Sequence, residues 1–185
     1  DLLSMLEERL RELSRGVEEL RLRAGEGGGI SIQMKTLPAV TCCMRRCEGH
    51  TIADKYNAMY DFYGECVRRG YQLSDEPMFT ISERRDYLDG YIGDAPYPYQ
   101  VCVPVRTETA PAEAVTLPEC RALSVLYYGG YDGVDEAFLT LGREVKARGL
   151  KPTGFVRVLG IVAPSTGREI AAQRYCSRLV LPVEG

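Results

Sequence analysis

The sequence predicts an α+β domain made of two strand-helix-strand-strand repeats related by a pseudo-twofold axis. In each half a Thr-Leu-Pro tripeptide comes first, then an amphipathic stretch that stops at a glycine, and then a run that ends in Pro-Val. Landmarks that recur in one order at one spacing indicate a duplicated structural unit. The paired landmarks are 36–38 and 116–118, Gly70 and Gly149, and 101–105 and 179–183, which are 78 to 80 residues apart.

Composition excludes several classes of protein. Of the 185 residues 45% are hydrophobic and 26% charged, which is typical of a globular domain. The net charge of -3 does not suit a chain whose main role is to hold a phosphate backbone. No apolar run approaches the roughly 18 residues of a membrane span, and no signal peptide opens the chain. We expect a cytoplasmic protein with no membrane contact.

Catalytic and metal-binding motifs are absent from the sequence. The single histidine, His50, excludes multi-histidine metal sites, and the seven cysteines include no CxxC pair. They are expected to be buried reduced thiols. Cys42 and Cys43 lie near His50, but nothing in the sequence supplies a group to orient a base. We expect no metal, no cofactor and no enzyme.

Residues 1–24 predict a coiled-coil helix. Its apolar residues alternate in steps of three and four, which is the seam of a helical dimer. The helix either pairs with a second copy of the chain or packs back on its own domain. The glycines of 25–29 break it and form a hinge, and 30–185 follow as the ligand-binding domain, with repeats near 30–106 and 112–185. The seam residues are Leu3, Leu6, Leu10, Leu13, Val17 and Leu20.

The first repeat predicts a strand over 39–44 and a helix near 52–69. Thr51 and Asp54 give the N-cap signal of the helix, and Gly70 follows its last turn. Two strands come next, joined by a long segment, 83–98, that the second repeat lacks. Long loops tend to be lids or walls of sites, although this one can also be an exposed excursion. The apolar helix face is predicted to hold Ile52, Tyr56, Met59, Tyr60, Tyr63 and Val67.

The second repeat predicts a strand over 120–128 and a helix near 133–148. Asp132 and Asp135 supply its cap signal, and Gly149 ends it. Two strands again follow. The apolar face of this helix is predicted to hold Val134, Ala137, Phe138, Leu141 and Val145.

Tyrosine is the outlier of the composition, with twelve residues against four phenylalanines. A tyrosine ring offers an apolar surface, a π-face and one hydrogen bond at low entropic cost. Tyrosines gather on the first helix, in the segment 83–98 and at 127–131. A groove between two repeats that is lined in this way suits flat hydrophobic ligands.

Six short motifs stand in an order and at a spacing that are typical of a known family, at 35–39, 101–105, 117–118, 128–131, 152–157 and 181–183. Through these motifs residues 30–185 resemble the GyrI-like (gyrase-inhibitor-like) domain, which is also the effector-binding domain of MerR-type transcription regulators. The resemblance implies a ligand-sensing domain that binds hydrophobic aromatic molecules. It also implies that 1–24 end a dimerisation helix, so that the chain forms a homodimer and a DNA-binding domain lies upstream of Asp1.

The sequence departs from the family where drug-sensing members carry two acidic residues in the pocket. Val158 stands at the place of one, Arg178 at the place of the other, and Gly160 replaces an aromatic residue. The departure predicts a neutral or anionic aromatic ligand held by Arg178. Two alternatives remain: an internal acid such as Glu65 or Glu144 pairs with Arg178, or a relocated carboxylate still binds cations.

Strand alternation and the resemblance together predict the residues that line the pocket. Two other functions stay open. One is a stand-alone binding protein of the same fold, and the other is a hydrolase that uses Tyr128 or Tyr131 with Asp86 or Asp89. The predicted ligand-binding residues are Met59, Tyr60, Tyr63, Tyr91, Val101, Val103, Leu126, Tyr128, Tyr131, Val158, Gly160, Cys176, Arg178 and Val180.

Overall fold

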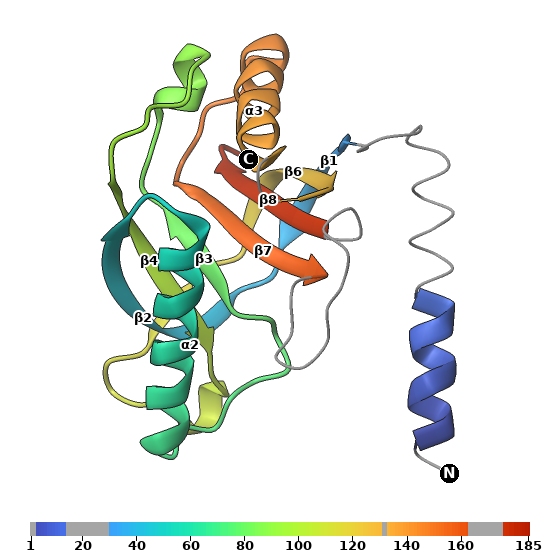
Figure 1. Cartoon of the computed structure of the whole chain (residues 1–185), viewed down its shortest axis with the longest axis vertical. Coiled ribbons are helices and arrows are strands. Elements are labelled where there is room, and N and C mark those ends of the chain that lie inside the picture. The colour runs from blue at the N-terminus through green and yellow to red at the C-terminus, as the bar shows by residue number, and fades with distance from the viewer. Residues whose placement is uncertain (1–2, 14–29, 131–132, 163–175) are drawn as a thin grey trace.

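The computed structural model describes residues 3–13, 30–130, 133–162 and 176–185, and it contains one eight-stranded antiparallel sheet (Figure 1). Residues 3–13 are helical. The predicted α+β class is confirmed. The strands are β1 (Ile30–Leu37), β2 (Val40–Gly49), β3 (Phe79–Ser82), β4 (Tyr97–Pro104), β5 (Val115–Leu117), β6 (Cys120–Tyr128), β7 (Val156–Val162) and β8 (Cys176–Val183), and the helices are α2 (Ile52–Arg68), α3 (Val134–Arg148) and the 3-10 turns η1 (Asp86–Asp89) and η2 (Thr107–Thr109).

The strand order reveals the internal symmetry of the domain. The order is β1-β6-β8-β7-β3-β4-β2-β5. When each strand of the first half, β1 to β4, is exchanged with its counterpart in the second half, β5 to β8, the same order is obtained in the reverse direction. The first strand of each half therefore pairs with the other half, β1 with β6 and β5 with β2. The predicted repeats lacked these two strands, which end in the repeated Thr-Leu dipeptides.

Helix α2 begins and ends where the sequence predicts. A capping box holds its first turn, since Asp54 N–H donates to Thr51 Oγ1 (3.1 Å) and Thr51 N–H donates to Asp54 Oδ2 (3.2 Å). The predicted apolar face is rotated from the real one, however. Phe62 and Cys66 are buried, whereas Tyr63 and Val67 are exposed. The core contact thus uses a narrow stripe of α2, and the tyrosines flank it.

Helix α3 buries the face that the sequence predicts. Ala137, Phe138, Leu141 and Val145 are all buried, and the helix ends at Gly149 in the left-handed conformation (φ 62°). Gly133 precedes the helix without a side-chain cap, and the expected cap residue Asp132 lies outside the described residues.

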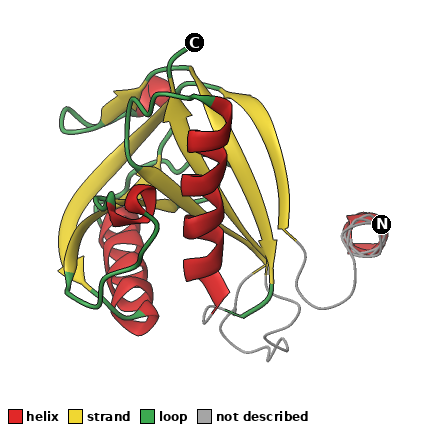
Figure 2. Cartoon of the chain, turned by 90° about the horizontal axis from the view of Figure 1, so that it is seen from above, coloured by secondary structure: helices red, strands yellow, loops and turns green. Residues whose placement is uncertain are grey.

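The two helices cover the same face of the sheet. Helix α3 packs with η1 on β6 and β8, around Leu123 and Leu179, whereas α2 packs on β2 and β4 around Val101. Figure 2 shows the curl of the sheet and both helices beside it. A smaller cluster, with Cys42, Phe79, Ile81 and Cys102 at its centre, lies on the opposite face.

The long segment 83–98 packs on α3. Its turn η1 buries Tyr87 with 1% of its surface exposed, edge-on to Phe138 with 5.5 Å between ring centroids. The Asp86 carboxylate is bound by Arg84 Nε (2.8 Å) and by the backbone N–H of Gly93 (2.7 Å). The segment therefore serves as part of the core, and only Tyr91 within it is a largely exposed aromatic residue.

The N-terminal helix exposes its apolar seam. Leu3, Leu6, Leu10 and Leu13 are 53 to 66% exposed, so the seam is available to a partner, and its pairing with a second copy stays a prediction. Val17, Leu20 and the hinge 25–29 lie outside the described residues. None of the described helices is long and apolar enough to cross a membrane.

Candidate functional site

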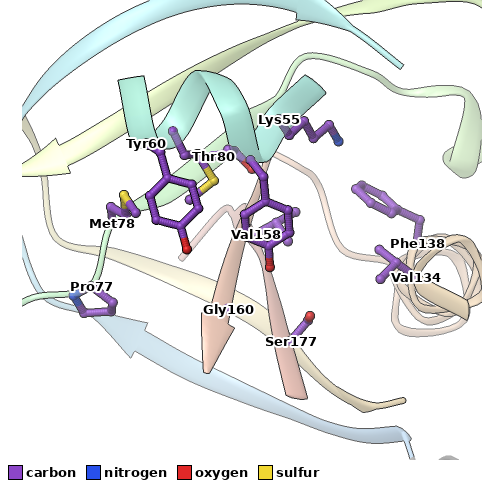
Figure 3. A pocket seen from close by; sticks show the side chains of 12 residues that line it. Lys55, Tyr60, Pro77, Met78, Thr80, Val134, Phe138, Val158, Gly160 and Ser177 are labelled. Atoms are coloured by element: carbon purple, nitrogen blue, oxygen red, sulfur yellow. The ribbon is translucent and has the colours of Figure 1, made fainter. Parts of the chain in front are cut away.

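A cleft of about 210 Å³ opens between α2 and α3, above the middle strands of the sheet (Figure 3). Each helix belongs to a different repeat, so the cleft lies where the two halves of the domain meet. The sequence predicted a ligand site in a groove between the repeats, and this cleft is the candidate for it. Its lining residues are Lys55, Tyr56, Met59, Tyr60, Pro77, Met78, Thr80, Val134, Phe138, Val158, Gly160 and Ser177.

One flank of α2 forms the first wall. Lys55, Tyr56, Met59 and Tyr60 recur at spacings of three and four, which places them on one side of a helix. The rings of Tyr56 and Tyr60 stack with their centroids 6.1 Å apart and their planes 21° apart. The wall thus presents aromatic surface and a thioether, with the phenol oxygens as its polar atoms.

The second wall and the floor are mainly apolar. Phe138 and Val134 project from the first turns of α3 toward the cleft (Figure 3). The floor is formed by three neighbouring strands. Thr80 of β3 pairs with Val158 of β7, and Gly160 of β7 pairs with Ser177 of β8. Residues that pair directly across strands share a face of the sheet. Gly160 has no side chain, and this leaves the floor open in front of Ser177.

The cleft carries one cation and no acid among its lining residues. Lys55 is the only charged residue in the described lining. Its Nζ donates a hydrogen bond to Tyr97 Oη and lies 4.6 Å from the centre of that ring. The lysine is therefore engaged at the end of the cleft, and the rest of the lining offers ring faces and the hydroxyl groups of Tyr56, Tyr60, Thr80 and Ser177.

Four of the predicted ligand-binding residues line this cleft: Met59, Tyr60, Val158 and Gly160. The others lie elsewhere. Four are buried in the domain: Val101 and Val103 under α2, and Tyr128 and Cys176 at 3% and 1% exposure. Three are on the opposite face of the sheet, namely Leu126 and the pair Arg178 and Val180, which line a different cleft there. Tyr63 and Tyr91 are exposed, and Tyr131 is outside the described residues.

The errors on β8 share one cause, the register of two strands. The sequence gives the alternation within β8 but not the residue of β7 that each β8 residue faces. In the structure Leu159 pairs with Arg178, so Val158 and Gly160 share their face with Leu179 and Ser177. The prediction that Arg178 enters the pocket between the repeats is therefore wrong.

Sequence reasoning also missed part of the lining. Phe138 and Val134 were expected only in a helix core, Tyr56 only on the apolar face of α2, and Ser177 was given no role. A pattern of hydrophobicity marks which residues leave the solvent. It does not mark which of them border a cavity, because that depends on how far two helices stand apart.

None of the cysteines is among the described lining residues of the cleft. The cysteines form no disulfide within the part of the chain that the structure describes. That part also contains no group of three or more His, Cys, Asp or Glu residues placed to hold a metal ion. Burial raises the pKa of the Cys43 thiol to about 11, which makes it a poor nucleophile.

No protein-family model matches the sequence, and no curated protein matches it. Solved structures do match. EcmrR in a complex with DNA superposes with a TM-score of 0.70 at 15% identity, over 97% of this chain and 65% of that one, so this chain spans about two thirds of the length of EcmrR. The isolated EcmrR C-terminal domain gives a TM-score of 0.69 at 16% identity, with 84% of this chain and 98% of that one covered.

A third match is the structure of SAV2435 bound to tetraphenylphosphonium. It gives a TM-score of 0.52 at 14% identity and covers 84% of this chain and 94% of that one. The predicted resemblance is confirmed at the level of the fold. The chain has the same fold as the EcmrR C-terminal domain, and this is the GyrI-like fold that the sequence predicted.

Proposed function

We propose that this chain is the effector-binding domain of a MerR-type transcription regulator, and that hydrophobic aromatic molecules bind between α2 and α3. Two findings support the proposal: the fold shared with EcmrR, a protein solved in a complex with DNA, and the presence of a cleft where the two repeats meet. In this proposal DNA contact belongs to a domain upstream of Asp1.

The lining of the cleft carries the proposal. Tyr56, Tyr60 and Phe138 offer ring surface on both walls, and Met59 offers a polarisable, adaptable contact. A flat ligand can stack on the tyrosines and reach Thr80 or Ser177 with one polar group. Such a lining selects ligands by their size and apolar surface and depends little on an exact pattern of hydrogen bonds.

The charge of the cleft favours neutral aromatic ligands over cations. No carboxylate lies among its described lining residues, and Lys55 adds a positive charge at one end. A lipophilic cation would lose its hydration without gaining an opposite charge. The anionic ligand first predicted depended on Arg178 in the cleft, and that residue is on the other face of the sheet.

A ligand at this place has a route to the rest of a regulator. It contacts one helix of each repeat, so its binding free energy depends on how the two halves stand relative to each other. We propose that two copies of the chain pair through the exposed leucines of the N-terminal helix, as the predicted homodimer requires. Ligand binding would then bias the arrangement of that dimer.

The two alternative functions differ from the proposed one in different ways. A stand-alone binding protein would use the same cleft, and only the presence of an upstream DNA reader separates it from a regulator. Of the two acids that the hydrolase could use, Asp86 is a poor candidate, because it is bound by Arg84 and its pKa is lowered to about 2, largely by that hydrogen bond. An acid so strongly ionised is a poor proton donor, and Tyr128 is buried.

The test uses the purified chain and a matched pair of probes. Triphenylphosphine oxide is neutral, and tetraphenylphosphonium has similar phenyl groups and a positive charge. We expect titration calorimetry to show tighter binding of the neutral probe and expect Val158→Trp, which fills the cleft, to abolish it. Equal binding by wild type and Val158→Trp would place the ligand elsewhere, and turnover of an added reactive ester would overturn the non-enzymatic role.

A further inference from the structure

A second cleft, of about 250 Å³, lies on the opposite face of the sheet from the interhelical cleft. Arg157, Leu159 and Val180 line it, whereas Val158 lines the first cleft. Alternation along β7 thus sends successive side chains to two separate cavities. The second cleft is independent of the proposed effector site.

Arg178 is the feature of this second cleft that needs an explanation. Its Nε is buried and has no hydrogen-bond acceptor among the residues that the structure describes. The two carboxylates that the sequence suggested as partners are engaged elsewhere, since Glu65 pairs with Arg45 and Arg69 and Glu144 pairs with Arg148 (2.8 Å). A buried guanidinium N–H without an acceptor is costly, so an acceptor from outside these residues would stabilise it.

The surroundings of Arg178 are positive. Arg157 lines the same cleft, with its guanidinium carbon 5.8 Å from the centre of the Phe79 ring. Lys35 lies on the same face of β1, and its pKa is lowered by burial and by the charge of Arg178. Glu76 is the only acid in the described lining, and it is exposed at the rim. The two arginines in the lining, Arg157 and Arg178, outnumber this acid.

The rest of the lining is apolar. Phe79, Leu159 and Val180 are among the residues that form it, and the crossover from β1 to β2 closes one side. A bare inorganic anion would satisfy Arg178 but leave this surface in contact with water. A molecule with one anionic group and an apolar body matches both parts.

We propose that this second cleft binds amphipathic anions, with a carboxylate, sulfonate or phosphate group on Arg178 Nε and an apolar body against Phe79 and Leu159. Arg157 adds to the attraction without a direct ion pair. The guanidinium is the group that selects the anion, because hydrogen bonds to a charged donor in a water-poor site are strong and directional.

The experiment compares two fluorescent probes that differ by one group. 8-Anilinonaphthalene-1-sulfonate carries a sulfonate, and N-phenyl-1-naphthylamine is the same molecule without it. We expect Arg178→Met, which keeps an unbranched apolar chain as far as the position of Nε and removes the guanidinium, to weaken binding of the sulfonate probe by about tenfold or more and to change binding of the neutral probe little. Arg178→Lys should restore part of the loss.

Two further measurements keep the outcome decisive. In the ¹H–¹⁵N spectrum the Arg178 Nε–Hε signal, assigned from its absence in Arg178→Lys, should shift on addition of the sulfonate probe. Val158→Trp fills the interhelical cleft, and the Arg178-dependent binding should survive it. The proposal is overturned if Arg178→Met binds the sulfonate probe as wild type does, or if Val158→Trp alone abolishes that binding. The proposed function is tested separately, by the binding of triphenylphosphine oxide in the interhelical cleft.

Discussion

Ser177 pairs with Gly160 across β7 and β8, and this pairing decides which side chains line the interhelical cleft. Ser177 points onto the helix-covered face because the paired residue, Gly160, lies on that face. Arg178, one residue later, points to the opposite face. A shift of the register by one residue would exchange the two and place a guanidinium among the tyrosines. The charge of each cleft therefore depends on one strand register.

Tyr60→Ala should weaken binding of triphenylphosphine oxide by about five- to tenfold, because it removes one wall of ring surface from the cleft. Tyr63→Ala is the matched control. Tyr63 is on the same helix and similarly exposed, 42% against 44% for Tyr60, but it does not line the cleft. Titration calorimetry measures both. Equal losses in the two variants would mean that the ligand does not lie between α2 and α3.

Val158→Glu should make the cleft select cations. The new carboxylate would lie on the floor of a cleft whose lining has no acid, and an opposite charge in a partly desolvated site favours a cationic ligand. We expect tetraphenylphosphonium to gain at least tenfold in affinity relative to triphenylphosphine oxide. Leu159→Glu adds the same charge on the other face and should not change the ratio. A gain of the same size in Leu159→Glu would contradict the assignment of faces.

Gly142→Ala should destabilise the domain by about 1 to 3 kcal/mol, although alanine is the better helix former. A Cβ at Gly142 would lie 2.2 Å from the backbone oxygen of Tyr87, which cannot move without displacing η1. Gly64→Ala is the control, since its Cβ would meet only the flexible end of Arg68 at 3.2 Å. Urea unfolding should show Gly64→Ala neutral or up to about 1 kcal/mol more stable. If both Gly142→Ala and Gly64→Ala were more stable than wild type, η1 would not be tightly packed on α3.

Asp86→Asn should remove a pH-dependent part of the stability. Arg84, which is 8% exposed, lowers the pKa of Asp86 from 3.8 to about 2. A pKa that is lower in the folded state contributes stability that is complete above about pH 4 and is lost as the pH falls toward 2. The contribution at pH 7 is about 2 kcal/mol.

Urea unfolding of wild type and Asp86→Asn at several pH values measures this contribution. The difference in unfolding free energy should shrink between pH 5 and pH 2. Asp61→Asn, at an exposed position of α2, is the control and should show little pH-dependent change. A difference between wild type and Asp86→Asn that stays constant with pH would show that the ionised form of Asp86 is not the stabilising one.

Charges in the N-terminal seam should separate the proposed dimer. Leu6→Glu combined with Leu10→Glu places like charges at facing positions of a helical pair and removes apolar contact. Sedimentation velocity should show wild type in a concentration-dependent equilibrium between monomer and dimer, and the double variant as a monomer. Glu8→Gln with Arg11→Gln changes charge outside the seam and should keep the dimer. A wild-type chain that stays monomeric at all concentrations would remove the proposed interface.

The sequence by itself determined the elements and their duplication. Capping residues such as Thr51 and the glycine after each helix act within one turn, so their effect can be seen in a short window of sequence. The repeated Thr-Leu-Pro and Pro-Val landmarks likewise predicted two equivalent halves and a groove between them. The two strands exchanged between the halves, β1 and β5, were missed because their pairing is with distant segments.

The faces of the sheet were decided only by the tertiary structure. Alternation within β7 and within β8 can be recognised in the sequence, but the register between them depends on thirteen intervening residues and on packing against β3 and β6. Likewise, the period of α2 predicted an amphipathic helix, yet its rotation was fixed by Phe62 and Cys66 fitting over β2 and β4. Periodicity in the sequence shows which residues share a face. What that face contacts is decided by long-range packing, whose free energy is summed over many contacts.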